Sequence, residues 1–384
     1  MNKADTRAVA IALALSLAAT GPQLLALSLL MPDISKTLNI SIILLGQLNT
    51  VFSIVCIVVS LAMGILTVKY SSKTLLLTGI ATLLIGVVGE ALSSDYASMI
   101  LFFILYGAGL GLVFPVTNLL MILFPQDQRT RAMGWVYSGR SLTSIIATPI
   151  IGFLAATYGW RAGYICFGLP LIALTGIVIL VKIPNQRADA TVDLTKGFRD
   201  IKANSSATAC LIATTLALIF FNGLMVYNGA YLRNNLGYGI ETAAVIMSFT
   251  FIAVAMGQVA SGAIASSVGV KRTTYLATII CGVSLLAYFS LNLPPTVAIL
   301  FSLIGTAAAG IIMTTLSILA LGLVPESRGT MMSLVNAGIS IGSMLSSVLG
   351  GLAIDSLGFT GFGAVFFTLS LAATIILIRW TREP

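Results

Sequence analysis

The sequence contains no histidine, and only 8% of its 384 residues are charged. Its four cysteines, Cys56, Cys166, Cys210 and Cys281, stand apart in apolar stretches and form no C-x-x-C pair. These features argue against a disulfide framework and against ordinary zinc or haem sites. Because no nucleophile–base pair or metal-ligand set appears either, we expect neither an enzyme nor a bound cofactor or metal.

The scarcity of charge also excludes a soluble protein. Hydrophobic residues make up 58% of the chain, and the mean hydropathy is +1.05. A soluble protein of this length needs a charged surface, and this chain has too few charges to cover one. We therefore expect an integral membrane protein that is surrounded by the lipid bilayer.

Long apolar runs are abundant. A helix needs about 20 predominantly apolar residues to cross the hydrocarbon core of a bilayer. The uncharged run 273–325 is divided at 292–295, because its consecutive prolines interrupt a helix. The sequence then predicts an all-α membrane protein with twelve transmembrane helices, near 8–32, 41–67, 74–94, 97–123, 132–157, 162–182, 207–232, 242–268, 272–292, 296–323, 330–354 and 360–379.

Lysines and arginines are distributed unevenly between the expected loops. Most of the 20 lie on the side that also holds both chain ends; Lys36, Arg161 and Arg233 lie in the opposite loops, and Arg140 lies within a span. Cytoplasmic loops carry the excess of these residues. We expect a multi-pass protein of the plasma (inner) membrane with both termini cytoplasmic, and the net charge of +8 gives no support to nucleic-acid binding.

A weak internal repeat divides the chain. Gly64 and Gly262 are separated by 198 residues, and a spacing of 199 relates Gly111, Arg129, Gly139, Gly152 and Gly159 to Gly310, Arg328, Gly338, Gly351 and Gly358. Parallel repeats of this kind are typical of transporters that bind substrate between two halves. We expect a six-helix bundle at 1–183, a cytoplasmic linker at 184–206 and a second six-helix bundle at 207–384.

Two basic loops resemble a conserved loop of the major facilitator superfamily. Their glycine and basic residues are Gly64, Lys69 and Lys73 in the first copy, and Gly262, Lys271 and Arg272 in the second. Both are similar to that family's G-x-L-a-D-r-x-G-r-k loop, except that Val68 and Ser266 stand where aspartate is usual. The glycine favours close helix packing, and the cations favour a cytoplasmic turn. A basic loop that merely follows the orientation rule is the alternative.

Further matches extend the resemblance over nearly the whole chain. Arg129 and Arg328 occupy similar loops before the fifth and eleventh expected helices, and Pro149 and Gly152 retain the Pro-x-x-Gly core of a G-P-x-x-G motif associated with antiporters. The resemblance implies two six-helix pseudo-repeats of the drug-exporter-like branch, with gating roles for these four residues and the two basic loops. Stripes of small residues, 144-148-152 and 338-342-346-350, fit a sliding interface or simple packing equally well.

Arg140 is the charge that we expect to bind substrate. It lies about nine residues into the fifth expected helix, or about 13 Å deep. An intramembrane arginine costs at least about 2.5–3.5 kcal/mol on insertion scales, so it should face a wet cavity or a partner. With Tyr137 one turn away, it would bind an anionic or strongly hydrogen-bonding group. A snorkelling or packing arginine near the inner gate is the alternative.

Other polar residues lie on helices that the resemblance implies line the cavity, or beside them. Each one is explained equally well by an interhelical hydrogen bond, although the group at 222–231 is the richest. The residues that we expect to contact substrate are Gln23, Tyr106, Asn118, Asn222, Tyr227, Asn228, Tyr231, Thr314 and Asn336.

Carboxylates are scarce within the expected spans. They fall near outer helix ends, and none lies at mid-membrane. Proton-driven drug exporters of this family usually keep an acid on helix 1 or 4 and an arginine on helix 4, and 102–106 contains no arginine. Asp33 and Glu90 are therefore the remaining candidates for coupling to H⁺.

Together these features predict a monomeric secondary transporter that moves a small organic molecule by alternating access. The Pro149–Gly152 motif and the amide-rich segment 222–231 favour an exporter of drug-like molecules or metabolites. One alternative is a carrier of organic anions or sugars that is anchored by Arg140. The other is a membrane sensor that binds a ligand without transporting it.

Overall fold

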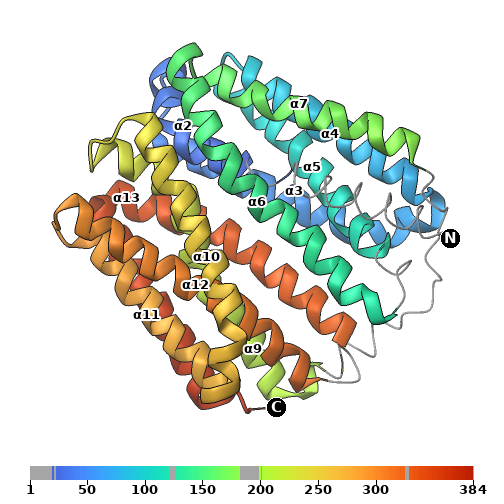
Figure 1. The fold of residues 1–384 in the computed structure, drawn as a ribbon, viewed down its shortest axis with the longest axis vertical. Coiled ribbons are helices and arrows are strands. Elements are labelled where there is room, and N and C mark those ends of the chain that lie inside the picture. The colour runs from blue at the N-terminus through green and yellow to red at the C-terminus, as the bar shows by residue number, and fades with distance from the viewer. Residues whose placement is uncertain are drawn as a thin grey trace. The chain divides into compact units, whose positions relative to one another are not determined.

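The computed structural model describes residues 20, 23–120, 126–181, 199, 201–324 and 328–383, some of them by their backbone alone. Every regular element within these residues is an α-helix (Figure 1). The helices are α2 (Gln23–Leu38), α3 (Ile42–Lys69), α4 (Ser72–Leu92), α5 (Tyr96–Leu120), α6 (Gln126–Tyr158), α7 (Trp160–Leu180), α9 (Ser205–Asn234), α10 (Ile240–Val268), α11 (Val270–Ser290), α12 (Pro295–Leu323) and α13 (Arg328–Trp380).

Most of the expected spans correspond closely to these helices; of the first, 8–32, the described helix covers only 23–32, and α2 continues to Leu38. Helix α13 is two helices joined at Gly358, whose φ of 66° and ψ of −165° are not helical. Counting its two parts separately, the helices named above form twelve segments; residues 201–203 are also helical and belong to none of them. The double proline separates two of them as predicted, because α11 ends at Ser290 and α12 begins at Pro295.

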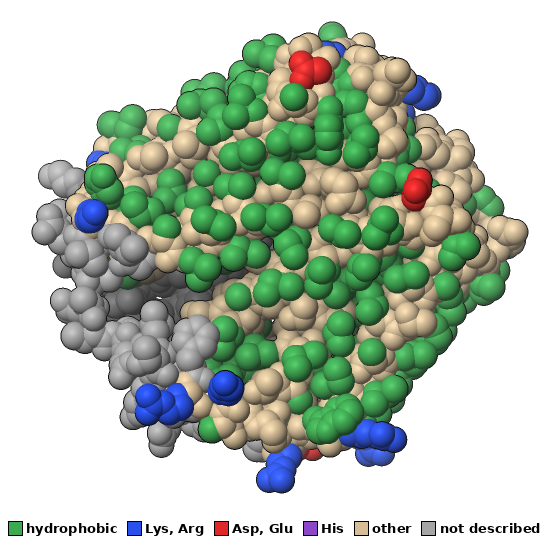
Figure 2. Space-filling model, turned by 180° about the vertical axis from the view of Figure 1, so that it is seen from behind, with side chains coloured by type: hydrophobic (Ala, Val, Ile, Leu, Met, Phe, Trp, Pro, Cys, Tyr) green, Lys and Arg blue, Asp and Glu red, His purple; other side chains and the backbone are tan. Residues whose placement is uncertain are grey.

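The helices have the apolar surfaces of a membrane protein. Among the described residues, nine helices are long and apolar enough to cross a bilayer. Large hydrophobic side chains point outward from them; Val259 is 84% exposed and Leu61 is 76% exposed. Figure 2 shows one face covered mostly by hydrophobic side chains, with few charged ones. Lipid, rather than water, suits such a surface.

The chain forms two compact units. Unit 1 comprises Met1–Thr191 and Leu232–Ser248, and unit 2 comprises Val192–Tyr231 and Phe249–Pro384. The end of α9 and the start of α10 thus form a hairpin that belongs to unit 1. The sequence repeat, in contrast, assigns this hairpin to the second half of the chain. In unit 1, α4 packs against α5 and α7 and α3 packs against α5; in unit 2, α11 packs against α12 and α13.

Small residues allow several close helix contacts inside the units. The repeated glycines Gly111 and Gly310 each face a backbone carbonyl of a neighbouring helix, those of Cys56 and Val254 respectively. At Gly262, in contrast, an added Cβ would meet nothing within 4 Å. The prediction that Gly262 serves close packing is therefore wrong. The surroundings of Gly64 lie outside what the structure describes.

The two stripes of small residues also pack within single units. Gly338 and Gly342 of α13 lie against Thr215 of α9 in unit 2, and Gly152 of α6 lies against Ala244 in unit 1. Simple packing, one of the two accounts of these stripes, therefore explains the observed contacts.

Candidate substrate and proton site

A buried carboxyl–amide pair lies in unit 1. The side chain of Glu90, on α4, is 0% exposed, and that of Gln23, on α2, is 3% exposed. Gln23 Nε2 donates to both carboxyl oxygens, at 3.1 Å to Oε1 and 3.0 Å to Oε2. The salt bridge among the described residues joins Arg233 to Asp33, so no described lysine or arginine pairs with Glu90. The carboxyl group is thus held by a neutral partner.

The burial of Glu90 follows from its position on α4. Leu76, Ile80, Leu83 and Val87 are all buried, at spacings of three and four residues. Residues so spaced lie on one face of a helix, and Glu90 is the next position on that face. The face packs toward α5 and α7, which lie beside α4 (Figure 1). The spacing of these apolar residues in the sequence thus predicts that Glu90 is buried, although Glu90 lies only two residues from the end of the helix.

Two buried tyrosines complete the surroundings of the pair. The Tyr106 hydroxyl, on α5, donates to the Thr20 carbonyl at 3.4 Å. The Tyr164 hydroxyl, on α7, has no hydrogen-bond partner among the described residues, and it lies within electrostatic range of Glu90. Tyr164 therefore has a donor available beside the carboxyl group.

Asp33, the second expected proton carrier, is placed differently. Arg233 Nη1 lies 2.5 Å from Asp33 Oδ2, and Nη2 lies 2.9 Å from Oδ1. Nη1 also donates to the Leu29 carbonyl at 3.1 Å. This two-pronged contact joins α2 to the hairpin at Leu232–Ser248 within unit 1. Because a guanidinium keeps its charge, Asp33 has a permanent cation as its partner and Glu90 does not.

In unit 2, Asn228 of α9 is a polar residue with an unused donor; the hydroxyl of Ser302 on α12 is another among the described residues. Asn228 is 1% exposed, and its Oδ1 accepts a hydrogen bond from the Tyr288 hydroxyl at 2.7 Å. Its Nδ2 has no partner among the described residues. A buried N–H without a partner is unfavourable, so a ligand that accepts a hydrogen bond there would gain stability.

The other expected ligands on α9 bind the protein itself. Tyr227 donates to the Ser347 carbonyl at 2.9 Å, and Asn222 donates to the Leu218 carbonyl at 2.9 Å. Tyr231 donates to the Tyr288 carbonyl at 2.8 Å. The Tyr231 ring also packs in an aromatic cluster, with ring centres at 4.7 Å from Phe289, 4.8 Å from Tyr288 and 5.0 Å from Phe359. The contacts of Tyr227 and Tyr231 hold α9 against its neighbouring helices.

Several expected site residues have other surroundings or are not described. Thr314 donates to the Gly310 carbonyl of its own helix at 3.3 Å, and Asn336 is exposed. Helix α6 begins at Gln126 rather than near 132, so Arg140 lies further from the start of its helix than predicted. The side chains that lie outside the described residues are those of Asn118, Arg129, Tyr137, Arg140 and Arg328.

The basic loops hold helix ends in both units. Lys73 Nζ donates to the carbonyls of Ile179 and Val181, at 2.8 and 3.0 Å. Lys271 Nζ does the same to Ile378 and Thr381, at 3.0 and 2.7 Å. Cations are favourable at the carbonyl end of a helix. Lys69 and Arg272 are exposed, and Pro149 lies inside α6.

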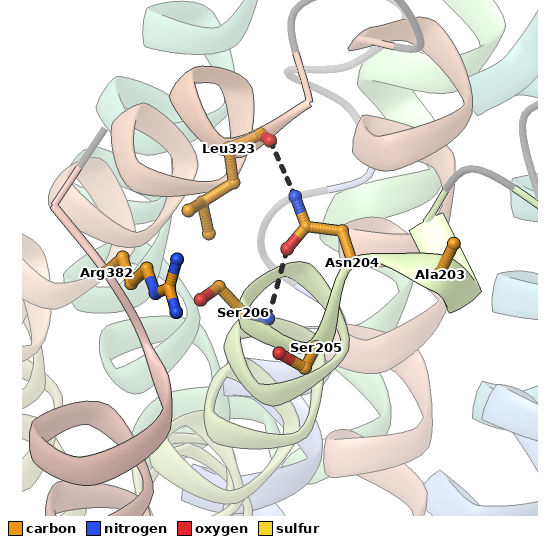
Figure 3. A pocket seen from close by; sticks show the side chains of 6 residues that line it. All are labelled: Ala203, Asn204, Ser205, Ser206, Leu323 and Arg382. Atoms are coloured by element: carbon orange, nitrogen blue, oxygen red, sulfur yellow. Dashed lines mark hydrogen bonds between the residues drawn. The ribbon is translucent and has the colours of Figure 1, made fainter.

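An open depression of about 510 Å³ in unit 2 lies away from these pairs. It is lined by residues at the ends of helices: Ala203, Asn204, Ser205, Ser206, Leu323 and Arg382 (Figure 3). Asn204 Nδ2 donates to the Leu323 carbonyl at 3.0 Å, and its Oδ1 accepts from the Ser206 amide at 3.1 Å. These are helix-capping bonds, so we do not place the substrate there.

Known proteins resemble the chain in sequence and in fold. It is 24% identical over 253 residues to the hexuronate transporter of Bacillus subtilis, covering 62% of this chain and 59% of that protein. It is 23% identical over 266 residues to the sialic acid transporter NanX of Escherichia coli, covering 66% of this chain and 63% of that protein. The chain thus spans less than two thirds of the length of each of these relatives. A D-xylose-proton symporter has the same fold, with a TM-score of 0.84 at 15% identity over 98% of both chains.

The family assignment rests on a match along the whole chain. The pattern of the Major Facilitator Superfamily matches residues 10–328 and again residues 210–384. The proteins similar to this one are transporters, so the prediction that it is not an enzyme is confirmed. The chain is a member of the major facilitator superfamily, a multi-pass membrane protein that transports small molecules.

Proposed function

We propose that this protein is a proton-coupled transporter of small acidic molecules, such as sugar acids. The observation that carries the proposal is the Glu90 carboxyl group, fully buried in a membrane-spanning helix and held by a neutral amide. An intramembrane ionisable residue is expensive and marks a functional site. Glu90 is a better proton carrier than Asp33, because Arg233 neutralises Asp33.

The substrate class is supported by relatives and by the polar groups present. Hexuronates and sialic acid are sugars that carry a carboxylate, and transporters of both resemble this chain. Sugar hydroxyls need donors and acceptors, which Gln23 and Tyr164 offer in unit 1. Arg140 is the expected partner of the carboxylate. This substrate class corresponds to the organic anion or sugar carrier among the functions that the sequence allows.

Export of drug-like molecules, with membership of the drug-exporter-like branch, stays a prediction. It rests on Pro149 and Gly152, and the contact of Gly152 with Ala244 is compatible with transport in either direction. Cytoplasmic termini, a monomeric state, the boundaries at 184–206 and the gating roles of the basic loops also stay predictions.

Transport into proteoliposomes tests the proposal. The substrates are a radiolabelled hexuronate, sialic acid and, as a neutral comparison, D-xylose. We expect an inward proton gradient to accelerate uptake of an acidic sugar. The Glu90→Gln variant should lose this acceleration and still exchange substrate between the two sides without a gradient.

The exposed carboxylate of Asp355 supplies the control. Asp355→Asn should retain the response of uptake to the gradient. Efflux of drugs that persists in Arg140→Ala, together with no uptake of acidic sugars by the wild-type protein, contradicts the proposal.

A further inference from the structure

A single nitrogen atom of Gln23 contacts both carboxyl oxygens of Glu90. Its distances of 3.1 and 3.0 Å direct one N–H between the two oxygens. An ionised carboxylate accepts with both oxygens, whereas a protonated carboxyl group turns one oxygen into a donor. The ionised form, in which both oxygens only accept, matches this contact.

A protonated Glu90 needs a different atom of Gln23. Its O–H is a donor, and the amide nitrogen cannot accept it. If the Gln23 amide reverses, its Oε1 accepts from the Glu90 O–H while its Nε2 donates to the other Glu90 oxygen. Both side chains are buried, so bulk water does not supply the missing partner. A buried donor without a partner is costly, which favours the reversed amide.

We infer that Glu90 is a positioning residue that acts through Gln23: binding of a proton to Glu90 reverses the Gln23 amide and withdraws its oxygen from the substrate. The inference rests on the proposed function, since it takes this pair to face an acidic substrate. In the ionised form, Gln23 turns its Oε1 acceptor away from Glu90. In the protonated form, Oε1 is bound to Glu90, and an N–H of Gln23 is left for the substrate.

This change suits a substrate that carries a carboxylate. A carboxylate only accepts hydrogen bonds, so it pairs with the N–H that Gln23 keeps free in both forms, and withdrawal of Oε1 in the protonated form removes an acceptor that would repel it. Protonation also removes the negative charge of Glu90, which repels an anion. Proton and substrate therefore strengthen each other's binding, and by linkage the two effects are equal.

The tyrosines around Glu90 are neutral neighbours that donate hydrogen bonds. Helix α5 presents Tyr106, which donates to a backbone carbonyl. Helix α7 presents Tyr164, whose hydroxyl has no partner among the described residues. The Tyr164 hydroxyl does not donate to Glu90 in this structure, so among the described residues the hydrogen bonds to the carboxyl group come from Gln23.

The charged groups on the helices packed against α4 are engaged or remote. Arg161 of α7 donates to the Ser93 carbonyl at 3.0 Å, and its guanidinium lies 4.3 Å from the centre of the Trp160 ring. Helix α3 carries Lys69 at its last residue and a thiol at Cys56. Among the described side chains, the exchange of a proton therefore falls to Glu90.

Infrared difference spectroscopy on the purified full chain in lipid nanodiscs tests the inference, with the proton as the only ligand. As the pH falls, we expect the C=O band of a protonated carboxylic acid to appear, together with a change in a glutamine amide C=O band. The chain has 12 aspartates and glutamates, so the Glu90 band is the part of the carboxyl signal that the wild type shows and Glu90→Gln lacks. Gln23→Leu should keep a carboxyl band at a shifted frequency and lose the amide change. Asp355→Asn should keep both.

Two outcomes overturn the inference. One is a carboxyl band that persists unchanged in Glu90→Gln; the other is a Gln23→Leu protein whose carboxyl and amide bands match those of the wild type. The Gln23→Leu comparison keeps the test decisive if Glu90→Gln does not fold. Because no substrate is present, the bands test the amide switch alone, and failed uptake of acidic sugars tests only the proposed function.

Discussion

Among the described residues, each unit holds a buried amide that is hydrogen-bonded to a side chain of a neighbouring helix, and the two partners differ in chemistry. In unit 1, Gln23 of α2 binds the Glu90 carboxyl group of α4; in unit 2, Asn228 of α9 accepts from the Tyr288 hydroxyl of α11. Glu90 and Tyr288 are 198 residues apart, the spacing that also separates Lys73 and Lys271. The repeat thus places a carboxyl–amide pair in one unit and a hydroxyl–amide pair in the other.

Where the units agree, their residues build the fold. Lys73 and Lys271 bind the carbonyls at the ends of α7 and α13 in the same way. Gly159 and Gly358 both have positive φ, 86° and 66°, at corresponding turns. The residues that match between the units lie at helix ends. The corresponding residues Glu90 and Tyr288 differ in their side-chain chemistry. The position at which Glu90 in one unit corresponds to Tyr288 in the other is therefore where we propose that substrate transport is coupled to protons.

Transport measurements should separate the two pairs most strongly. In Glu90→Gln, uptake driven by a proton gradient should fall about tenfold, equivalent to about 1.4 kcal/mol, while exchange without a gradient continues. Tyr288→Phe leaves Asn228 Oδ1 without its described donor, so uptake should fall equally with and without a gradient. A loss of the gradient response in Tyr288→Phe, with Glu90→Gln unaffected, would reverse the assignment of the two pairs.

Much of the fold is predictable because span length and helix breakers act locally. Helix α12 runs from Pro295 to Leu323 where 296–323 is expected, and α10 runs from Ile240 to Val268 where 242–268 is expected. A double proline or a charged turn ends a helix wherever it occurs. The open space at Gly262 was not predictable in this way, because close packing depends on a neighbouring helix.

The site was less predictable, because its partners are far apart in sequence. Gln23 and Glu90 were assigned separately, to substrate and to protons, and 67 residues lie between them. No spacing rule joins residues on two helices, although the buried face of α4 points to Glu90. Conversely, the polarity of Tyr227 and Tyr231 suggested ligands, and both hydroxyls bind backbone carbonyls. Polarity alone does not distinguish these uses.

The corresponding turns should respond alike to a change of backbone. Gly159 has φ 86° and ψ 166°, and Gly358 has φ 66° and ψ −165°. Only glycine adopts this region readily, so Gly159→Ala and Gly358→Ala should each destabilise the protein by about 1–3 kcal/mol. Thermal unfolding in detergent measures the effect. Gly262→Ala, in helical backbone with open space around it, should leave the melting temperature unchanged or slightly raised. Equal losses in all three variants would contradict the backbone explanation.

The lysines at the two helix ends should contribute similar, smaller amounts. Each binds two carbonyls at a partly exposed position, so Lys73→Ala and Lys271→Ala should each cost about 0.5–1.5 kcal/mol of stability. The exposed neighbours Lys69 and Arg272 are matched controls, and their alanine variants should melt close to the wild type. A larger loss in the controls would show that loop charge, rather than the carbonyl contacts, stabilises these ends.

The starts of α5 and α12 give the smallest expected difference. Asp95 Oδ1 accepts from the Ser98 amide at 2.8 Å, whereas α12 begins after Pro294 with no side-chain cap. The Ser98 amide, followed by the hydroxyls of Ser98 and Ser94, lowers the pKa of Asp95 below its ordinary value of 3.8. A carboxylate whose pKa is lowered by folding stabilises the folded state above its unfolded pKa and loses that effect as the pH falls through the folded pKa. The melting temperature of the wild type relative to Asp95→Asn should therefore be constant near neutral pH and decrease slightly below pH 3.8. A relative melting temperature that rises on acidification would mean that the Ser98 amide does not favour the ionised cap.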